Sequence, residues 1–211
     1  MIIESITSVN RTKSRVLCRD AENPALVDFI LSNRAVLDLD LREGQETDPE
    51  TEAGILASLR KECLSACGNL LKLQDYTAAR LRQKLKQAGF PDEVIGQCLE
   101  EMEDARYLDD SRYAEHFIEA HLTDRSLKRI WEDLRMRGVP EDVIRTALEN
   151  TAGEAYGGAD GPEEKQIRDF LEKKRYDPET AGYEEKMKLM AALYRKGYRT
   201  ELIRKVLGTY D

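Results

Sequence analysis

The hydrophobic residues between positions 107 and 150 follow the period of an α-helix in three short blocks. Ser126 precedes the middle block, and serine is a preferred residue at a helix N-cap. Gly138 follows the block and can end the helix, because glycine adopts the left-handed conformation without a Cβ penalty. Pro140 is predicted at the first position of the third helix. The apolar face of the middle helix consists of Leu127, Ile130, Trp131 and Leu134.

The same layout occurs three times, and each copy is centred on a glycine, with spacings of 49 and 59 residues. The glycines are Gly89, Gly138 and Gly197. Four residues before each glycine is a leucine: Leu85, Leu134 or Leu193. Five and six residues after it is an aliphatic pair, and ten residues after it is another leucine: Val94-Ile95 with Leu99, Val143-Ile144 with Leu148, and Leu202-Ile203 with Leu207. Such periodicity indicates stacked helical units. We therefore predict a mainly α protein of three tandem three-helix repeats that form an elongated, curved rod.

The first 50 residues have a different pattern. Runs of strand-forming residues at 2–9 and 14–18, with a polar segment between them, predict a hairpin. Residues 25–31 fit either a third strand or a short helix. Residues 37–41 alternate like a strand, although Asn33 can instead cap a brief helix there. A small β-rich module is expected, and it must pack on the helices because an isolated hairpin is marginal in water.

The segment TAGEAYGGADGP after Asn150 has no large aliphatic residue and ends in proline, as is typical of a linker. It is expected to let the last repeat move relative to the first two. The predicted domains are a β-rich module at 1–50, repeats at 51–106 and 107–150, a flexible linker at 151–162 and a third repeat at 163–211.

Composition bounds the class of protein. The chain is 41% hydrophobic and 35% charged, with neither an apolar run long enough to span a membrane nor a signal-peptide pattern, so we expect a soluble chain. We also expect it to be a monomer, and to be cytoplasmic because free thiols suit a reducing compartment. Cys63 and Cys67 lie one helical turn apart, as two metal ligands can, but His116 and His121 lack ligand-like spacing. Buried free thiols are the favoured interpretation of the cysteines, which are Cys18, Cys63, Cys67 and Cys98.

No catalytic or phosphate-binding motif is present in the sequence, so no catalytic residue, metal or cofactor is predicted. The pair Asp109-Asp110 resembles half of a metal site, but its place before a helical stripe favours capping. Trp131 is expected in the core rather than as a base-stacking platform. The glycines at 157, 158 and 161 are spaced too irregularly to hold phosphate and belong to the linker.

The net charge of −8 argues against a surface that binds nucleic acid throughout, but cations gather on particular helices. The helix containing Arg80 has four cations and no acid, which favours a partner over a solvated face. For Lys128 and Arg129, nearby Glu132 and Asp133 leave both interpretations open. Residues 163–211 contain twelve Lys or Arg against ten Asp or Glu. The candidate partner-binding residues are Arg80, Arg82, Lys84, Lys86, Lys128, Arg129, Arg135, Arg137, Lys186, Lys188, Arg195, Lys196, Arg199, Arg204 and Lys205.

Several motifs are similar to those of the RecX family of bacterial recombination regulators. They are Leu71-Lys72-Leu73-Gln74-Asp75-Tyr76-Thr77, Leu81-Arg82-Gln83-Lys84-Leu85 with Gly89-Phe90, Tyr107-Leu108-Asp109-Asp110-Ser111-Arg112-Tyr113-Ala114, and Lys128-Arg129-Ile130 with Leu134 and Gly138-Val139. The resemblance covers roughly residues 55–208. It implies three tandem three-helix repeats, in agreement with the repeat count obtained from the spacing.

The resemblance further implies a non-enzymatic protein that binds the RecA filament in its groove, and that inhibits ATP hydrolysis and strand exchange in recombination, DNA repair and the SOS response. Contact with single-stranded DNA inside the filament is left open. Glu119 and His121 stand where relatives are more basic, which favours contact with protein over contact with DNA. Two alternatives are a helix-turn-helix protein that binds duplex directly, with steep salt dependence, and a helical-repeat adaptor for another partner.

Overall fold

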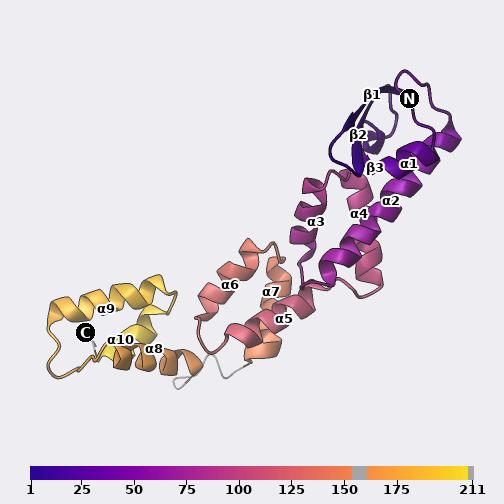
Figure 1. The fold of residues 1–211 in the computed structure, drawn as a ribbon. Coiled ribbons are helices and arrows are strands. Elements are labelled where there is room, and N and C mark those ends of the chain that lie inside the picture. Colours follow the sequence, from indigo (N-terminus) through magenta and orange to yellow (C-terminus); the bar gives the residue numbers. More distant parts are fainter. Residues whose placement is uncertain (154–160, 209–211) are drawn as a thin grey trace. The chain divides into compact units, whose positions relative to one another are not determined.

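A computed structural model describes residues 1–153 and 161–208, which form two compact units, Met1–Asp109 and Asp110–Asp211 (Figure 1). Most of the linker predicted at 151–162, including Gly157 and Gly158, lies outside the described residues. Within the described residues, every helix is too short or too polar for a membrane span.

The first unit begins with a three-stranded antiparallel sheet in the order β1-β2-β3. Strands β1 (Ile2–Ser8) and β2 (Lys13–Arg19) form the predicted hairpin, and Asn10 organises its turn by accepting a hydrogen bond from the backbone N–H of Thr12 at 2.9 Å. In the third strand, β3 (Asp28–Ser32), Phe29 pairs with Val16 of β2. Figure 1 shows the sheet beside the N-terminal part of helix α2 (Pro49–Leu71).

Residues 25–31 and 37–41, whose sequence fitted either a strand or a helix, each have a defined structure. Residues 25–31 contain the end of a 3-10 turn, η1 (Pro24–Leu26), as well as most of β3. The alternating residues near 37–41 do not form a strand, because helix α1 (Asn33–Asp38) covers the beginning of that segment. Its N-cap is Ser32 rather than Asn33, since the Ser32 hydroxyl accepts from the N–H of Ala35 at 3.2 Å.

The sheet and the first repeat share one hydrophobic core. The repeat consists of α2, α3 (Ala78–Gln87) and α4 (Asp92–Asp104). Burial of apolar side chains is the main driving force that holds such elements together. The fully buried residues of this core include Ile3, Val16, Phe29 and Leu31 from the sheet, and Ile55, Leu59, Leu81, Leu85 and Ile95 from the helices.

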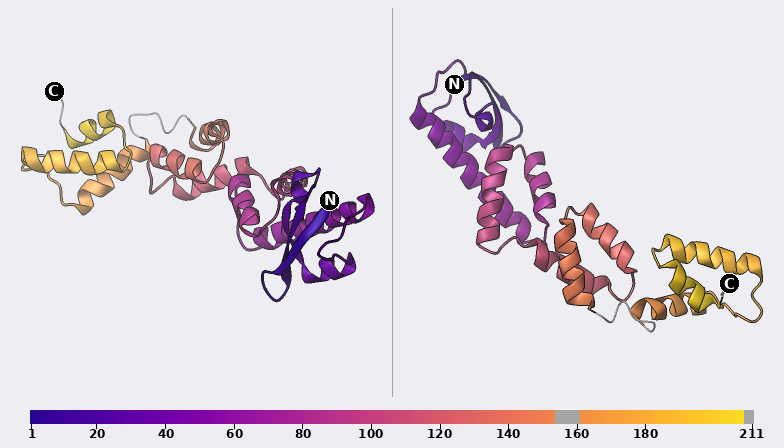
Figure 2. Two further views of the ribbon diagram at one scale, coloured as in Figure 1. Left: turned by 90° about the horizontal axis from the view of Figure 1, so that it is seen from above. Right: turned by 180° about the vertical axis from the view of Figure 1, so that it is seen from behind.

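The second unit contains two further repeats, each with its own core. The second repeat consists of α5 (Asp110–His121), α6 (Leu127–Met136) and α7 (Glu141–Ala152). The third consists of α8 (Pro162–Lys173), α9 (Tyr183–Arg195) and α10 (Thr200–Leu207). Figure 2 shows each of these three-helix units from two further sides. Pro140 precedes α7 as its N-cap rather than occupying the first helical position, because its ψ of 144° is not helical.

The three repeated glycines have the same backbone geometry. Gly89, Gly138 and Gly197 have φ angles of +86°, +79° and +91°. Each glycine N–H donates to the carbonyl three residues earlier at 2.9 Å, and the next N–H donates to the carbonyl five residues earlier at 3.2–3.3 Å. This is the Schellman arrangement, in which the residue after the glycine packs on the residue four positions before the glycine. The recurring leucine of the sequence pattern is therefore half of that contact.

Two of these glycines also touch another part of their own unit. A Cβ on Gly89 would collide with the Ile30 side chain of β3. A Cβ on Gly197 would lie 2.6 Å from the Ser126 Oγ at the start of α6. The corner at Gly197 therefore lies directly against the second repeat, and glycine at this position permits both the positive φ and the close approach.

Candidate functional site

The contact between the second and third repeats starts at the N-terminus of α6. The buried Ser126 hydroxyl accepts from the N–H of Arg129 at 3.3 Å and donates to the carbonyl oxygen of Lys196 at 2.7 Å. The N–H of Leu127 donates to the buried Glu163 carboxylate at 2.9 Å. A carboxylate near a helix N-terminus interacts favourably with the helix dipole, so Glu163 of α8 stabilises α6.

Gln166 adds a third hydrogen bond to this contact. The Gln166 side-chain amide of α8 donates to the carbonyl oxygen of Leu122 at 2.8 Å, and Tyr198 donates its hydroxyl hydrogen to Gln166 at 2.9 Å. Burial raises the pKa of Tyr198 to about 12, so its hydroxyl remains a neutral donor near pH 7. The two repeats are thus held by polar groups that are satisfied within the fold.

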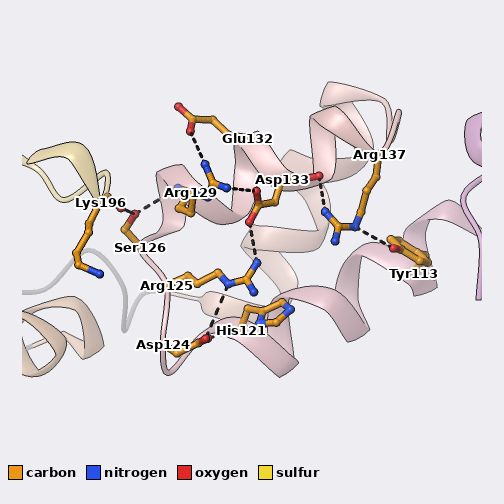
Figure 3. A network of polar contacts seen from close by, with 10 residues as sticks. All are labelled: Tyr113, His121, Asp124, Arg125, Ser126, Arg129, Glu132, Asp133, Arg137 and Lys196. Carbon is orange, nitrogen blue, oxygen red and sulfur yellow. Dashed lines mark hydrogen bonds and ion pairs between the residues drawn. The ribbon is translucent and has the colours of Figure 1, made fainter. Parts of the chain in front are cut away.

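Beside this contact lies a cavity of about 500 Å³. Its second-repeat wall is organised by Asp133, whose side chain is only 5% exposed. Asp133 accepts from Arg125 at 2.7 Å and from Arg129 at 3.0 Å (Figure 3). A buried carboxylate is costly unless it is paired, so the ion pairs of Asp133 with the two arginines are maintained. These ion pairs hold both guanidinium groups at the cavity wall.

Arg137 extends this wall. Its guanidinium donates to the Tyr113 hydroxyl at 3.1 Å and to the Asp133 carbonyl oxygen at 3.0 Å (Figure 3). It also lies 4.5 Å from the centre of the Phe117 ring. The remaining residues that line the cavity are Asp124 and Ser126 of the second repeat and Arg195, Lys196 and Tyr198 of the third. Its walls therefore carry five cationic side chains and two carboxylates.

Four of the candidate partner-binding residues meet at this cavity: Arg129, Arg137, Arg195 and Lys196. The sequence interpretation did not include Arg125, because it lies in the loop before α6 and off any helical stripe. Its only signal was its place directly before the capping Ser126. From the sequence, Asp133 was considered only as an ion-pair partner within its own helix. In the structure it joins two arginines from different segments, Arg125 of the loop and Arg129 of α6.

The cations of α3 form a separate surface in the first unit. Arg80, Arg82, Lys84 and Lys86 are all exposed. Lys86 pairs with Asp92 at the start of α4, at 2.8 Å. No described carboxylate lies within ion-pair distance of the other three.

The other candidate cations have various surroundings. Lys205 pairs with the buried Glu164 at 2.6 Å, and Lys128 lies 5.8 Å from the Tyr194 ring centre. Lys186 donates to the Pro178 carbonyl oxygen at 3.3 Å. Four further members of the set are exposed: Arg135, Lys188, Arg199 and Arg204.

The four cysteines are buried free thiols, as the sequence interpretation expected. Hydrogen bonds with Cys67 and Cys98, together with burial, raise the pKa of Cys63, so its thiol is neutral near pH 7. Cys98 donates its thiol hydrogen to the Arg60 carbonyl oxygen at 3.7 Å. All four thiols lie in the core that the sheet and the first repeat share.

Comparison with known proteins gives consistent matches along the chain. Family models described as the first, second and third three-helix domains of RecX match residues 63–102, 109–148 and 162–207. The regulatory protein RecX of Trichlorobacter lovleyi is 35% identical over 149 residues, which cover 69% of this chain and 93% of that protein. The regulatory protein RecX of Caldanaerobacter subterraneus subsp. tengcongensis is 30% identical over 175 residues, covering 81% and 82%.

Solved structures show the same fold. A crystal structure of a regulatory protein RecX has a TM-score of 0.63 at 18% identity and covers 99% of both chains. The crystal structure of RecX from Lactobacillus salivarius has a TM-score of 0.62 at 20% identity and covers 72% of this chain and 96% of that one. With all three helical domains matched and the relatives covered over most of their length, the chain belongs to the RecX family of regulatory proteins.

Proposed function

We propose that this protein is a non-catalytic regulator that binds the RecA recombinase filament and inhibits its ATP hydrolysis and strand exchange, in the cytoplasm where recombination and DNA repair take place. Membership of the RecX family is the observation that carries the proposal. The resemblance implies a filament partner, and a repeated helical unit suits a partner that itself repeats.

The charged surfaces support a role in binding. On α3, three exposed cations have no described carboxylate partner, although the chain carries a net charge of −8. Arg195 and Lys196 of the third repeat also lack a carboxylate among the described residues within ion-pair distance. Cations that the fold leaves uncompensated are available to the acidic groups of a partner.

Several weak binding surfaces on one chain can together bind a filament tightly. Each exposed ion pair contributes only about 0.2–1 kcal/mol, so one repeat alone would bind weakly. When several surfaces of one chain engage one filament, the later contacts become intramolecular and the effective concentration rises. We therefore infer that the first and third repeats both contribute to filament binding.

The test is RecA ATP hydrolysis on single-stranded DNA with the protein titrated in. We expect inhibition that saturates near a fixed ratio of regulator to recombinase. The reversal of Lys186, Lys188, Arg195 and Lys196 to glutamate should weaken it at least about tenfold, equal to 1.4 kcal/mol. Reversal of Lys173, Lys174 and Arg175, which are exposed cations of the same repeat outside the candidate set, is the control.

No change in hydrolysis at excess regulator would reject the proposed function. Equal effects of the two sets of reversals would instead reject the assigned surface while keeping the function. Binding to free duplex with a loss of about a thousandfold in affinity between 50 and 200 mM salt would favour direct DNA binding instead.

A further inference from the structure

The cavity between the start of α6 and the end of α9 is lined mainly by cationic side chains. Its walls contain Arg125, Arg129, Arg137, Arg195 and Lys196, against two carboxylates, Asp124 and Asp133. The cavity therefore has an excess of three positive charges in a chain that is acidic as a whole. Like charges gathered around a cavity repel one another unless an anion lies between them.

The donors on the second-repeat wall are held in place. Asp133 binds Arg125 and Arg129 at the same time and is itself buried (Figure 3). A guanidinium has five N–H donors. Arg125 contacts Asp133 and, at 3.8 Å, Asp124, and Arg129 contacts Asp133 and, at 4.0 Å, Glu132, so N–H groups of both arginines remain for a further acceptor. The remaining N–H groups are fixed by a buried partner, so little side-chain entropy is lost when they bind an anion.

The donors on the third-repeat wall have weaker partners. Arg195 donates from Nε to the Ala191 carbonyl oxygen of its own helix at 3.3 Å, and the Lys196 ammonium lies 5.5 Å from the Phe170 ring centre. Neither contact neutralises the positive charge. Lys196 is also the residue whose carbonyl oxygen accepts from Ser126, so its backbone is fixed against the second repeat.

We propose that this cavity is a binding site for a phosphate-bearing anion, and that the bound anion holds the second and third repeats together. A carboxylate carries one negative charge and would leave most of the excess positive charge unmatched. A phosphoryl group carries close to two charges near pH 7 and offers three acceptor oxygens, and a diphosphate carries more. Arginine forks also match phosphate oxygens in bidentate geometry.

Because the cavity lies between the second and third repeats, an anion bound there stabilises the contact between them. An anion in the cavity contacts cations from both sides of the Ser126–Lys196 hydrogen bond, and it replaces repulsion across the cavity by attraction. Ligand binding to the folded junction stabilises it by mass action. This inference goes beyond the proposed function, because it concerns a ligand that binds with or without recombinase.

Titration of pyrophosphate into the full chain at constant ionic strength tests the site. We expect saturable heat of binding and a rise in melting temperature. In the double variant Arg195→Gln/Lys196→Gln the affinity should fall at least about tenfold, equal to 1.4 kcal/mol. The matched control is Lys173→Gln/Lys174→Gln, which removes the same charge from exposed positions of the same repeat and should bind pyrophosphate normally.

Circular dichroism of both variants establishes that each is folded. Absence of saturable binding into the millimolar range, or equal weakening in both variants, would overturn the site. Citrate that binds as tightly as pyrophosphate would overturn the assignment to phosphate. Competition by ATP and by a single-stranded oligonucleotide then distinguishes a free nucleotide from a polynucleotide backbone as the source of the phosphate.

Hydrogen exchange tests the effect on the junction. The Leu127 N–H donates to Glu163 across the two repeats, so its exchange reports opening of that contact. We expect slower exchange at Leu127 when pyrophosphate is present and no slowing in Arg195→Gln/Lys196→Gln. Unchanged exchange in the native chain at saturating pyrophosphate would show that the anion does not hold the repeats together.

Discussion

The Ser126 hydroxyl joins the start of one helix to the end of another, 70 residues later in the chain: it caps α6 and donates to the Lys196 carbonyl oxygen at 2.7 Å. A hydroxyl has one donor hydrogen and two acceptor lone pairs, so both functions are compatible. Ser126 is 1% exposed, which makes an unsatisfied partner costly. The cavity that we propose as an anion site lies directly beside this bond.

Ser126→Ala is expected to destabilise the protein by about 2 kcal/mol, because it removes an N-cap and leaves the Lys196 carbonyl oxygen without its donor. Urea unfolding measures the loss. Ser32→Ala, which removes the cap of α1 without a bond to another repeat, should cost about 1 kcal/mol. Equal losses in the two variants would show that the bond to Lys196 contributes nothing.

Gly197→Ala is expected to cost at least about 1 kcal/mol more than Gly208→Ala. Both glycines have a positive φ, at +91° and +67°, so both substitutions strain the backbone. At Gly197 the new Cβ meets the Ser126 hydroxyl, whereas at Gly208 no atom of the described residues lies within 4 Å. Thermal unfolding of the two variants side by side checks the difference, and equal melting temperatures would contradict it.

Glu164→Gln is expected to change the acid sensitivity of the protein. Hydrogen bonds from Lys205 and Arg168 lower the pKa of Glu164 in the fold. A lowered pKa contributes stability that is present above the unfolded value of about 4.5 and is lost as pH falls through the folded pKa. The stability difference between native protein and variant should therefore be largest near neutral pH and shrink below about pH 4.5.

Urea midpoints from pH 7 to pH 3 measure this difference. The control is Glu172→Gln, which changes an exposed carboxylate of the same helix. A constant difference between native protein and Glu164→Gln across the range would show that the contacts with Lys205 and Arg168 do not depend on the charge of Glu164.

Replacement of Arg80, Arg82 and Lys84 by glutamine is expected to weaken inhibition of RecA ATP hydrolysis by about tenfold, because three exposed ion pairs together contribute about 1.4 kcal/mol. The fold should be unaffected, since these side chains are exposed and have no described carboxylate partner. Replacement of Lys173, Lys174 and Arg175 by glutamine is the matched control. Full inhibition by the α3 variant would exclude this surface.

The cysteines are expected to react with a thiol reagent only when the protein unfolds. Cys18 is 5% exposed and the other three are fully buried. Burial also raises the pKa of Cys18 to about 11, so little of the reactive thiolate is present near pH 7. Absorbance after addition of an aromatic disulfide reagent follows the reaction. Ser65→Cys places a thiol at an exposed position of α2 and should react at once, whereas fast reaction of the native protein would contradict the buried core.

Features that depend on neighbouring residues were predictable from the sequence. The helix ends follow from capping residues such as Asp48, Thr77 and Ser126, each of which accepts a hydrogen bond from an N–H three residues later. The glycine corners follow in the same way, because their hydrogen bonds span only three to five residues. The segment near residues 37–41 was ambiguous, since alternation and capping favoured different structures there.

What the tertiary structure alone decided is which charges are compensated and which face one another. Glu163 and Glu164 are typical residues for the first turn of a helix, but in the fold they are buried, one against Leu127 and the other against Lys205. These pairs are separated by 36 and 41 residues. Local periodicity contains no information about such distances, because the approach of two repeats depends on the packing of whole helices. The sequence therefore determined the three-helix unit and its corners, and the packing of the second repeat on the third determined the cationic cavity.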